Sequence, residues 1–444
     1  MPHECYDVGD MVFNHVQKFS EKSSFLNDEK KQAVLKLCLN DIVMGALLGS
    51  GAFNHVYEAQ LRNAETVQRD DTKSQCFTYE GHKENEEARY VVKRLRPETT
   101  EDPDTFKIGA MDLALEAKLL SCMNHKNIVK LHGVTAGCPS KAFTSSLCGN
   151  SSSRYFLVLE RLQCTLSERI ADWYQEERRY RKGVLPFKSP GLCESKRKEL
   201  LMGRLRAACD IAEGLAYLHT NNIAYRDLKP ENIGFDRNGT AKIFDFGLAK
   251  ELHPDDANRR PTALVGTFRY MAPEVAKCKN YGLSIDAYSF GLLLWEICFL
   301  RRPFCKFSRQ QLMDKVIYGG NRPKTDPSLC PSSILGLMQL CWSSDAKDRP
   351  RLATAAVILE ESIINGIDGW NAEKQSTRQL PRRKSIQIAT IVKGEVSRQY
   401  NDNHSDEENS ARLSQPRSAS SRRLVDKIEH YTSIGHKSYN FDWS

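Results

Sequence analysis

The sequence lacks paired cysteine motifs, although it contains 14 cysteines among its 444 residues. The cysteines are scattered, and neither a CxxC pair nor a His/Cys spacing typical of zinc sites occurs. This pattern predicts reduced thiols and no zinc site.

Long apolar segments are also missing. The N-terminal stretch MPHECYDVGDMVF has no basic segment followed by an apolar run, so it does not resemble a secretory signal. The longest strongly apolar stretch, Phe290 to Leu300, is too short to span a bilayer and contains Glu296. We therefore expect a buried core helix there, no transmembrane segment, and a cytoplasmic location with access to the nucleus left open.

Neither sign of charge dominates, because 64 basic and 56 acidic residues give a formal net charge of +8. Such a balance favours a solvated basic surface with mild attraction for acidic partners. We therefore expect no specific nucleic-acid binding.

The order of the apolar patterns indicates the fold class. From Asp41 short apolar runs alternate with turns, and Val91 to Leu95 continues this strand pattern. One helix is expected at about 106–123, and helical patterns dominate from about residue 209. Strands followed by helices predict an α+β chain in two lobes, a small, mainly antiparallel β lobe with one key helix and a larger, mainly helical lobe.

The expected boundaries follow from changes in composition. Residues 1–40 form an N-terminal extension, in which Ala33, Val34 and Leu37 have the spacing of a short helix. The two-lobed domain spans about 41–366, divided near residue 160. Residues 367–444 are rich in Ser and Arg and are predicted to be disordered. Polar insertions predict surface loops at about 62–89, 137–153 and 174–199.

The first candidate site is the segment LLGSGAFNHVY, residues 47–57. Gly49 and Gly51 lie in a turn between two expected strands, where the backbone can approach an anion such as phosphate. Taken alone, this spacing is more typical of a plain hairpin turn than of a phosphate-binding loop.

Two charged residues in apolar surroundings form the second candidate. Lys93 lies within the strand pattern YVVKRL, where a buried cation needs an anionic partner. Glu116, on the expected helix, is the natural partner. For either residue alone, an exposed surface charge is the better interpretation.

The segments AYRDLKPENIGFD and KIFDFGLAK hold most of the polar chemistry. Asp227 can accept a hydroxyl proton, Lys229 can neutralise a transferring phosphoryl group, and Asn232 can hold a metal. Asp245 offers a carboxylate to Mg²⁺ directly after a strand, and we expect Gly247 to provide the sharp turn that follows.

Taken together, residues from about Asp41 to Ser362 resemble a eukaryotic protein kinase domain. The strings GTFRYMAPE and SIDAYSFGLLLWEI are most similar to the tyrosine-kinase-like group of serine/threonine kinases. The resemblance implies ATP and Mg²⁺ as cofactors, protein serine or threonine as substrate, and a role in intracellular signalling.

The resemblance also implies a role for each matching residue. Asp227 and Lys229 are the catalytic pair, and Asn232 and Asp245 bind Mg²⁺. The implied ATP-binding residues are Leu48, Gly49, Gly51, Val56, Lys93, Glu116, Glu160 and Leu162. Glu274 of the Ala-Pro-Glu motif is expected to pair with Arg349, and Asp286 to brace the catalytic loop.

Several positions depart from the kinase pattern. Asn54 replaces the third glycine of the Gly-rich loop, where its tolerance of left-handed dihedrals would help. Tyr225 replaces a histidine and keeps a ring for packing under Phe246. Gly234 replaces the leucine that usually forms the floor of the adenine pocket.

The region around the adenine pocket supports one further hypothesis. Val91 stands where a smaller alanine usually forms the ceiling, so the exchange with Gly234 suggests an adenine slot displaced toward the larger lobe. Leu159 is the expected gatekeeper, with Glu160 to Leu162 as the hinge. Cys164 lies near the pocket rim, and an ordinary thiol is the plainer interpretation.

Control and substrate choice are less well specified. An upstream kinase could phosphorylate Thr262 and pair it with Arg226, although an unmodified loop threonine fits equally. Glu231 stands where some kinases recognise an arginine before the target hydroxyl. Arg382, Arg383 and Lys384 make Ser385 a candidate phosphorylation site, and the basic tail could instead dock acidic partners or membrane.

Two other functional classes remain as alternatives. A pseudokinase scaffold would bind nucleotide and partners without catalysis, and it usually lacks the lysine or an aspartate that are present here. A kinase of small molecules or lipids is disfavoured by Thr267 and the complete Ala-Pro-Glu segment, which resemble a peptide-binding platform.

Overall fold

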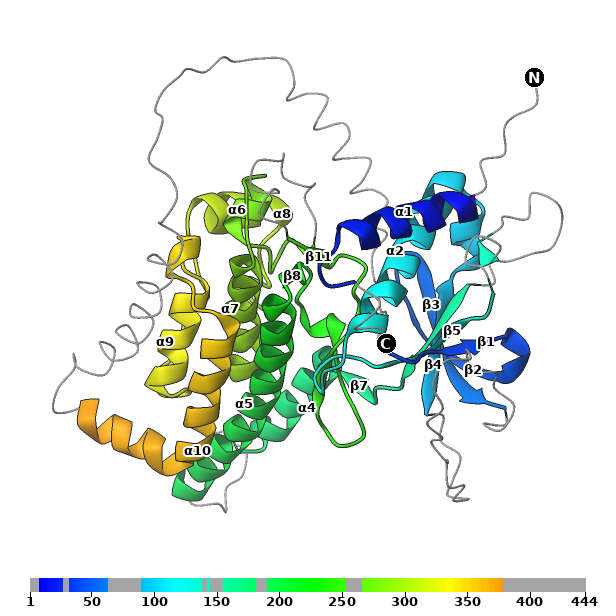
Figure 1. The fold of residues 1–444 in the computed structure, drawn as a ribbon. Helices are drawn as coiled ribbons and strands as arrows, with labels where there is room; N and C mark the ends of the chain where they lie inside the picture. The colour runs from blue at the N-terminus through cyan, green and yellow to red at the C-terminus, as the bar shows by residue number, and fades with distance from the viewer. Residues whose placement is uncertain are drawn as a thin grey trace, which may run out of the picture.

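The computed structural model describes residues 8–26, 32–62, 89–137, 142–143, 155–180, 190–252 and 266–377. Figure 1 shows a smaller lobe built around a sheet and a larger lobe built from helices. The predicted α+β fold in two lobes is therefore confirmed.

The small lobe contains a six-stranded sheet in the order β1-β5-β6-β4-β3-β2. Neighbouring strands pair antiparallel, except that β1 and β5 are parallel. The strands are β1 (Leu35–Leu37), β2 (Ile42–Ser50), β3 (Asn54–Leu61), β4 (Tyr90–Leu95), β5 (Leu131–Thr135) and β6 (Phe156–Glu160).

The helix predicted at about 106–123 is present as α2 (Pro103–Cys122). Asp102 caps its start, since the carboxylate accepts a hydrogen bond from Thr105 N at 2.8 Å. Pro103 suits the first turn, because a helix leaves that backbone donor without an internal partner. Phe106, Leu113 and other apolar residues bury one face, which fixes α2 beside the sheet.

The N-terminal extension differs from the prediction. The helix there is α1 (Val8–Lys22), whereas Leu35–Leu37 form β1. Leu37 is completely buried, and β1 gains hydrogen bonds from β5. A pattern of three apolar residues suits a helix and a strand equally, so long-range pairing decided the outcome.

The large lobe is assembled around α7 (Ser284–Phe299), in which residues 285–298 are all buried. This confirms the core helix expected from the apolar stretch. Around α7 and beside it lie α4 (Leu166–Arg178), α5 (Pro190–Thr220), α9 (Ser332–Cys341) and α10 (Leu352–Thr377). Short strands and turns complete the lobe: β7 (Cys164–Thr165), β8 (Ile223–Ala224), η4 (Pro230–Asn232), β9 (Ile233–Phe235), β10 (Ala241–Ile243), β11 (Lys250–Glu251) and α6 (Pro273–Ala276).

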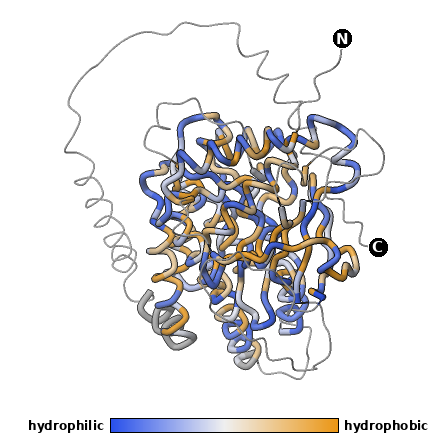
Figure 2. The backbone as a smooth tube through the Cα atoms, turned by 45° about the vertical axis from the view of Figure 1, so that its right-hand side comes forward, coloured by the Kyte–Doolittle hydropathy of each residue, from blue (hydrophilic) through white to orange (hydrophobic). Residues whose placement is uncertain are grey.

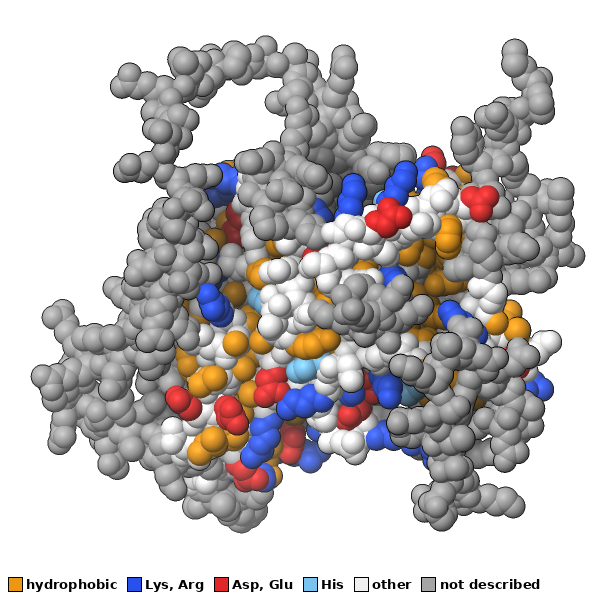
Figure 3. All heavy atoms as spheres, viewed as in Figure 1, with side chains coloured by type: hydrophobic (Ala, Val, Ile, Leu, Met, Phe, Trp, Pro, Cys, Tyr) orange, Lys and Arg blue, Asp and Glu red, His pale blue; other side chains and the backbone are white. Residues whose placement is uncertain are grey.

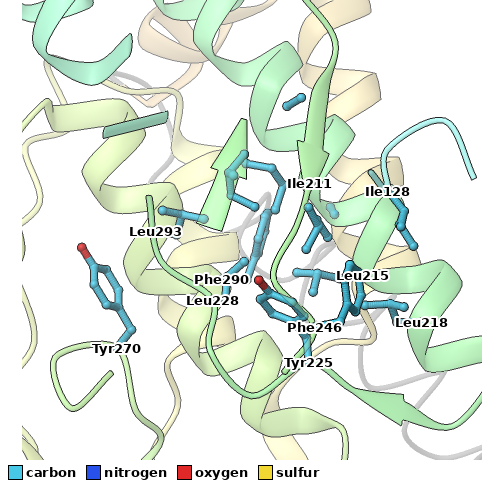
Figure 4. Packing of buried hydrophobic residues seen from close by; sticks show 14 of the residues in the cluster. Ile128, Ile211, Leu215, Leu218, Tyr225, Leu228, Phe246, Tyr270, Phe290 and Leu293 are labelled. Carbon is cyan, nitrogen blue, oxygen red and sulfur yellow. The ribbon is translucent and has the colours of Figure 1, made fainter. Parts of the chain in front are cut away.

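Hydrophobic residues concentrate inside the molecule, as the orange segments of Figure 2 show. One continuous cluster runs from the small lobe through the large lobe. Figure 4 shows part of it, where Tyr225 and Phe246 lie together beside α5 residues such as Leu215. The core therefore reaches the loops that carry the polar candidates.

The expected surface loops are only partly correct. Most of 174–199 is helical, because α4 continues to Arg178 and α5 begins at Pro190. Buried Glu177 accepts hydrogen bonds from Arg204 at 2.5 Å and Arg197 at 3.3 Å, which joins the two extended helices. In the insertion expected at about 137–153, Phe143 is fully buried and its ring stacks on that of Tyr155. Residues 63–88, 138–141 and 144–154 lie outside the described residues.

The helical end of the large lobe extends beyond the expected boundary. The α10 helix continues to Thr377, with a non-helical break at Gly366. The segment predicted to be disordered, 367–444, overlaps the last residues of this helix, and residues 378–444 lie outside the described residues. Within the described ranges, no helix is long and apolar enough to cross a membrane. On the face in Figure 3, basic and acidic side chains are interspersed.

Candidate active site

Three parts of the chain meet at Lys93. Its ammonium donates to Glu116 Oε2 at 2.6 Å and to Asp245 Oδ1 at 2.8 Å. These side chains come from β4, α2 and the loop after β10. Lys93 is 8% exposed and Glu116 is 2% exposed, so a lost partner would leave an uncompensated buried charge.

The charges of this cluster support one another. Burial opposes the ammonium of Lys93, but attraction to Asp245 and Glu116 raises its pKa overall. Burial also opposes the Asp245 carboxylate, yet Lys93 outweighs that effect and the pKa of Asp245 is lowered. For Glu116 burial dominates, and its pKa is raised. Lys93 and Asp245 are therefore charged at neutral pH, as phosphate and cation binding require.

Asp227 lies at the centre of a second polar cluster. Lys229 Nζ donates to Asp227 Oδ2 at 2.7 Å, and the Thr267 hydroxyl and backbone amide donate to Asp227 Oδ1 at 2.7 and 2.8 Å. Asn232 Nδ2 donates to Asp227 O and Oδ2, both at 3.0 Å. The carboxylate is thus held in one orientation beside a cation and a hydroxyl.

A buried carboxylate beneath this loop fixes its backbone. Asp286 on α7 is fully buried and accepts from Tyr225 N at 2.8 Å and Arg226 N at 2.9 Å. His219 Nε2 lies 2.9 Å from Asp286 Oδ2. Arg226 has a positive φ of 70°, a strained conformation for a side chain of this size. Asp286 braces the loop in the way expected.

A second ion pair joins two segments of the large lobe. The Arg349 guanidinium donates to Glu274 Oε1 at 2.5 Å and Oε2 at 3.0 Å, so the pair is bidentate. Arg349 also donates to Ser284 O at 3.1 Å, at the start of α7. The expected pairing between these residues is therefore present.

Comparison with known proteins agrees with this geometry. The family model described as protein tyrosine and serine/threonine kinase matches residues 42–359, which is well over half of the chain. The chain belongs to this protein kinase family.

Individual relatives are similar over part of the chain. Serine/threonine-protein kinase STY46 of Arabidopsis thaliana is 29% identical over 288 residues, covering 65% of this chain and 42% of that protein. Serine/threonine/tyrosine-protein kinase HT1 of the same plant is 34% identical over 157 residues, covering 35% and 39%. Dual specificity protein kinase shkB of Dictyostelium discoideum is 35% identical over 164 residues, covering 36% and 25%. The chain spans less than half the length of these relatives.

The Gly-rich loop of the kinase domain is a hairpin between β2 and β3. Gly51 N donates to Asn54 O at 2.7 Å, and an added Cβ at Gly49 would meet no atom within 4 Å. Val56 pairs with Lys93 across β3 and β4, while Leu48 is 44% exposed. Asn54 begins β3 without a positive φ, so its tolerance of left-handed dihedrals is not used.

The space next to Gly234, on which the hypothesis of a displaced adenine slot depends, is occupied by a residue of the hinge. An added Cβ at Gly234 would lie 2.5 Å from Leu162 Cδ1 and 3.0 Å from Leu162 Cβ. Leu162 therefore fills the space that Gly234 was expected to leave open. Across the sheet Val91 pairs with Leu159, the expected gatekeeper, and Glu160 accepts from Lys130 N at 2.7 Å.

The structure also describes Cys164 near the pocket rim and the packing of Tyr225 on Phe246. Cys164 is half-buried, and burial raises the pKa of its thiol, as an ordinary unreactive cysteine requires. Tyr225 and Phe246 contact edge to face with ring centroids 5.5 Å apart, the packing expected for this pair.

The sharp turn after β10 lies at a different residue from the one expected. Asp245 has a φ of 77°, whereas Gly247 is not among the residues with positive φ. The strained backbone is therefore at the proposed metal ligand itself, as is common where a site must hold one geometry.

Two residues near the site were missed in the sequence. Gly266 has a φ of 101°, and a Cβ there would lie 2.3 Å from Arg226 O, so only glycine lets Thr267 approach Asp227. Asp112 precedes Glu116 by one helical turn, a spacing that places both on one face of α2. Burial and then repulsion from Asp245 raise the pKa of Asp112 to about 7.

Proposed function

We propose that this chain is a serine/threonine protein kinase that transfers the γ-phosphate of ATP to hydroxyl groups of other proteins. The observation that carries this proposal is the Asp227 carboxylate held by Lys229 and Thr267, together with the intact Lys93–Glu116 pair. Transfer is mainly a matter of positioning and charge stabilisation, which these two clusters can supply.

Each residue would have a distinct part in the reaction. Asp227 would orient the acceptor hydroxyl and receive its proton. Lys229 would neutralise negative charge on the phosphoryl group during its transfer. Lys93 would hold the α- and β-phosphates, with Glu116 fixing its direction. Leu162 would form the floor of the adenine slot in place of a larger residue at Gly234.

The proposed magnesium site fits the residues present. Asn232 and Asp245 offer amide and carboxylate oxygens, the hard donors that Mg²⁺ prefers. The two hydrogen bonds from Asn232 Nδ2 to Asp227 fix the amide plane. When bound, the ion would neutralise charge on the transferring phosphates, and Asp245 already carries the lowered pKa suited to a cation.

Serine or threonine is favoured over tyrosine because Lys229, two residues after Asp227, and Thr267 resemble the pattern of serine/threonine kinases, and the two side chains are in contact at 3.2 Å. The test is labelled phosphate transfer from ATP and Mg²⁺ to matched peptides with serine, threonine or tyrosine as the sole acceptor. We expect labelling of serine and threonine. Labelling of tyrosine alone would contradict the acceptor class, and nucleotide binding without transfer would favour the pseudokinase scaffold.

Acidic residues near the peptide platform support a preference for a basic substrate residue. Burial, and to a smaller extent the charge of exposed Glu231, raises the pKa of Glu296, whose carboxylate accepts from the Tyr270 hydroxyl at 2.5 Å. The charges of Arg269 and Arg302 lower the pKa of Glu296, so basic side chains also lie near these carboxylates. We therefore expect only a modest preference for a basic residue in the substrate. Peptides differing only in arginine or glutamine before the acceptor test it.

Thr262 and Ser385 are proposed as regulatory phosphorylation sites of this kinase. Thr262, with Arg259 and Arg260, and Ser385 in the basic tail lie outside the described residues. Arg226, the expected receiver of a phosphate, donates to Leu248 O at 2.6 Å and Tyr281 OH at 3.2 Å. Phosphate mapping after incubation with ATP tests both sites, and the cytoplasmic location is a prediction that imaging of the tagged chain tests.

A further inference from the structure

The N-terminal strap, residues 8–26, is an integral part of the kinase core. Its helix α1 lies along α2 in Figure 1, with Gly9 and Val12 buried in the contact. After the helix, Phe25 and Leu26 are each only 2% exposed. Burying side chains of this size contributes about 1.5–3 kcal/mol each, so the strap is held firmly.

The strap also contacts the segment that follows the Asp-Phe-Gly motif. Ser24 N and Oγ donate to Glu251 Oε1 at 3.0 and 2.6 Å, and Ser23 Oγ donates to Glu251 Oε2. Glu251 is 2% exposed, so these donors help to offset the loss of water around its charge. Ser23 Oγ in turn accepts from Phe25 N and Leu26 N, which fixes the turn.

Glu251 connects the strap to the catalytic loop. It lies on β11, which pairs with β8 immediately before that loop. The strap therefore bridges α2, which carries Glu116, and the ribbon that leads to Asp227. Farther along, Gln32 N donates to Ser121 O at 2.8 Å, so the chain also contacts the end of α2.

We propose that the N-terminal strap positions α2 for the Lys93–Glu116 contact, and that Ser24 is a modification site whose phosphorylation releases it. The proposal rests on the proposed kinase function. Ser24 is exposed, whereas Ser23 is half-buried, so Ser24 is the hydroxyl that a kinase can reach.

Phosphorylation of Ser24 would make its contact with Glu251 repulsive. Transfer from ATP forms a bond between Ser24 Oγ and the γ-phosphorus, breaks the bond from that phosphorus to the β–γ bridging oxygen, and releases ADP and the hydroxyl proton. The modified oxygen can no longer donate to Glu251, and the phosphate places negative charge against a buried carboxylate. The strap would leave β11, and α2 would lose one of its supports.

The test uses the full chain with Ser24→Glu, and in parallel the chain with phosphoserine installed at position 24. Asn14→Glu adds the same charge to an exposed position of α1, and Ser24→Thr keeps the hydroxyl. We expect kcat to fall about tenfold in the first two proteins. Amide hydrogen exchange should quicken in α2 and stay unchanged in α7. Both control variants should match the parent.

A second variant distinguishes positioning from simple damage to the fold. Glu251→Gln can donate to a carboxylate at position 24, so adding it to Ser24→Glu should restore kcat and slow exchange in α2. The proposal is overturned if Ser24→Glu and Asn14→Glu behave alike, or if the double variant stays impaired. A parent chain that transfers no phosphate would contradict the proposed function, while exchange in α2 would still decide the role of the strap.

Discussion

The two polar clusters of the site are built in different ways. The Asp227 cluster lies mostly within one loop, and buried Asp286 holds that loop from below. The Lys93 cluster joins β4, α2 and the segment around Asp245, residues separated by up to 152 positions. The first cluster therefore follows from the large lobe alone, whereas the second exists only while α2 stays in place.

This difference indicates where control is easiest to exert. Moving the Asp227 loop would expose Asp286 and the core beneath it, at a cost of several kcal/mol. Moving α2 requires that one helix shift together with its N-terminal strap, while the Asp227 loop stays in place. We therefore expect the Lys93 cluster to be the adjustable part and the Asp227 cluster to be preformed.

The largest expected effect is that of Asp286→Ala on the preformed cluster. The substitution leaves the amides of Tyr225 and Arg226 without their buried acceptor. We expect the free energy of unfolding to fall by about 3–5 kcal/mol, with loss of phosphate transfer. Urea unfolding measures this, and Asp314→Ala at an exposed site is the control. A change below 1 kcal/mol would contradict the bracing role.

The next largest effect is expected for Lys93→Met in the adjustable cluster. The variant removes the cation between Glu116 and Asp245, so two carboxylates face each other without compensation. We expect kcat/KM for ATP to fall about 100-fold or more, because the phosphates lose their cationic partner. Lys107→Met on the exposed side of α2 should change little. Steady-state kinetics at varied ATP concentration distinguishes the two.

A smaller effect is expected at the floor of the adenine slot. Gly234→Leu forces a side chain into the space of Leu162, and such overpacking costs about 1–3 kcal/mol. ATP affinity should fall by roughly 5- to 150-fold. Adding Leu162→Ala should restore it, since the two residues exchange volumes. Calorimetric titration with ATP measures both, and a double variant as weak as the single one would contradict this packing.

The last prediction concerns Glu296 in the large lobe, where the effect depends on pH and leaves the active site itself unchanged. Burial raises the pKa of this carboxyl from 4.5 to about 7. Between those values the unfolded chain has lost the proton and the folded chain has kept it, so stability falls as pH rises through this window. Glu296→Gln should remove that fall, on the order of 3 kcal/mol by pH 8. Thermal unfolding of both proteins from pH 5 to pH 8 tests this, and parallel curves would contradict it.

The sequence predicted the residues of both clusters because each lies in a short, recognisable string. Lys93, Asp227 and Asp245 were identified from their neighbours alone, and the structure brings their partners within hydrogen-bond distance. What the sequence could not predict are contacts made by residues outside these strings. Ser24 and Glu251 are 227 positions apart, and nothing near either residue indicates the other.

Local errors had local physical causes. The helix expected around Ala33 and Leu37 became a strand because β5 offered hydrogen bonds. Gly234 suggested an open floor, since the position of Leu162 depends on the path of the hinge rather than on its own neighbours. The fold class was robust to both, because it depended on the order of many strands and helices.

The most direct test of the central claim compares the parent chain with Asp227→Asn in phosphate transfer and in ATP binding. We predict that transfer to serine or threonine peptides falls about 10²- to 10⁴-fold while ATP affinity is kept, because Asp227 lies outside the Lys93 cluster. Transfer that continues at the parent's rate in Asp227→Asn would contradict the proposed catalytic residue, and a loss of ATP affinity would contradict the separation of the two clusters.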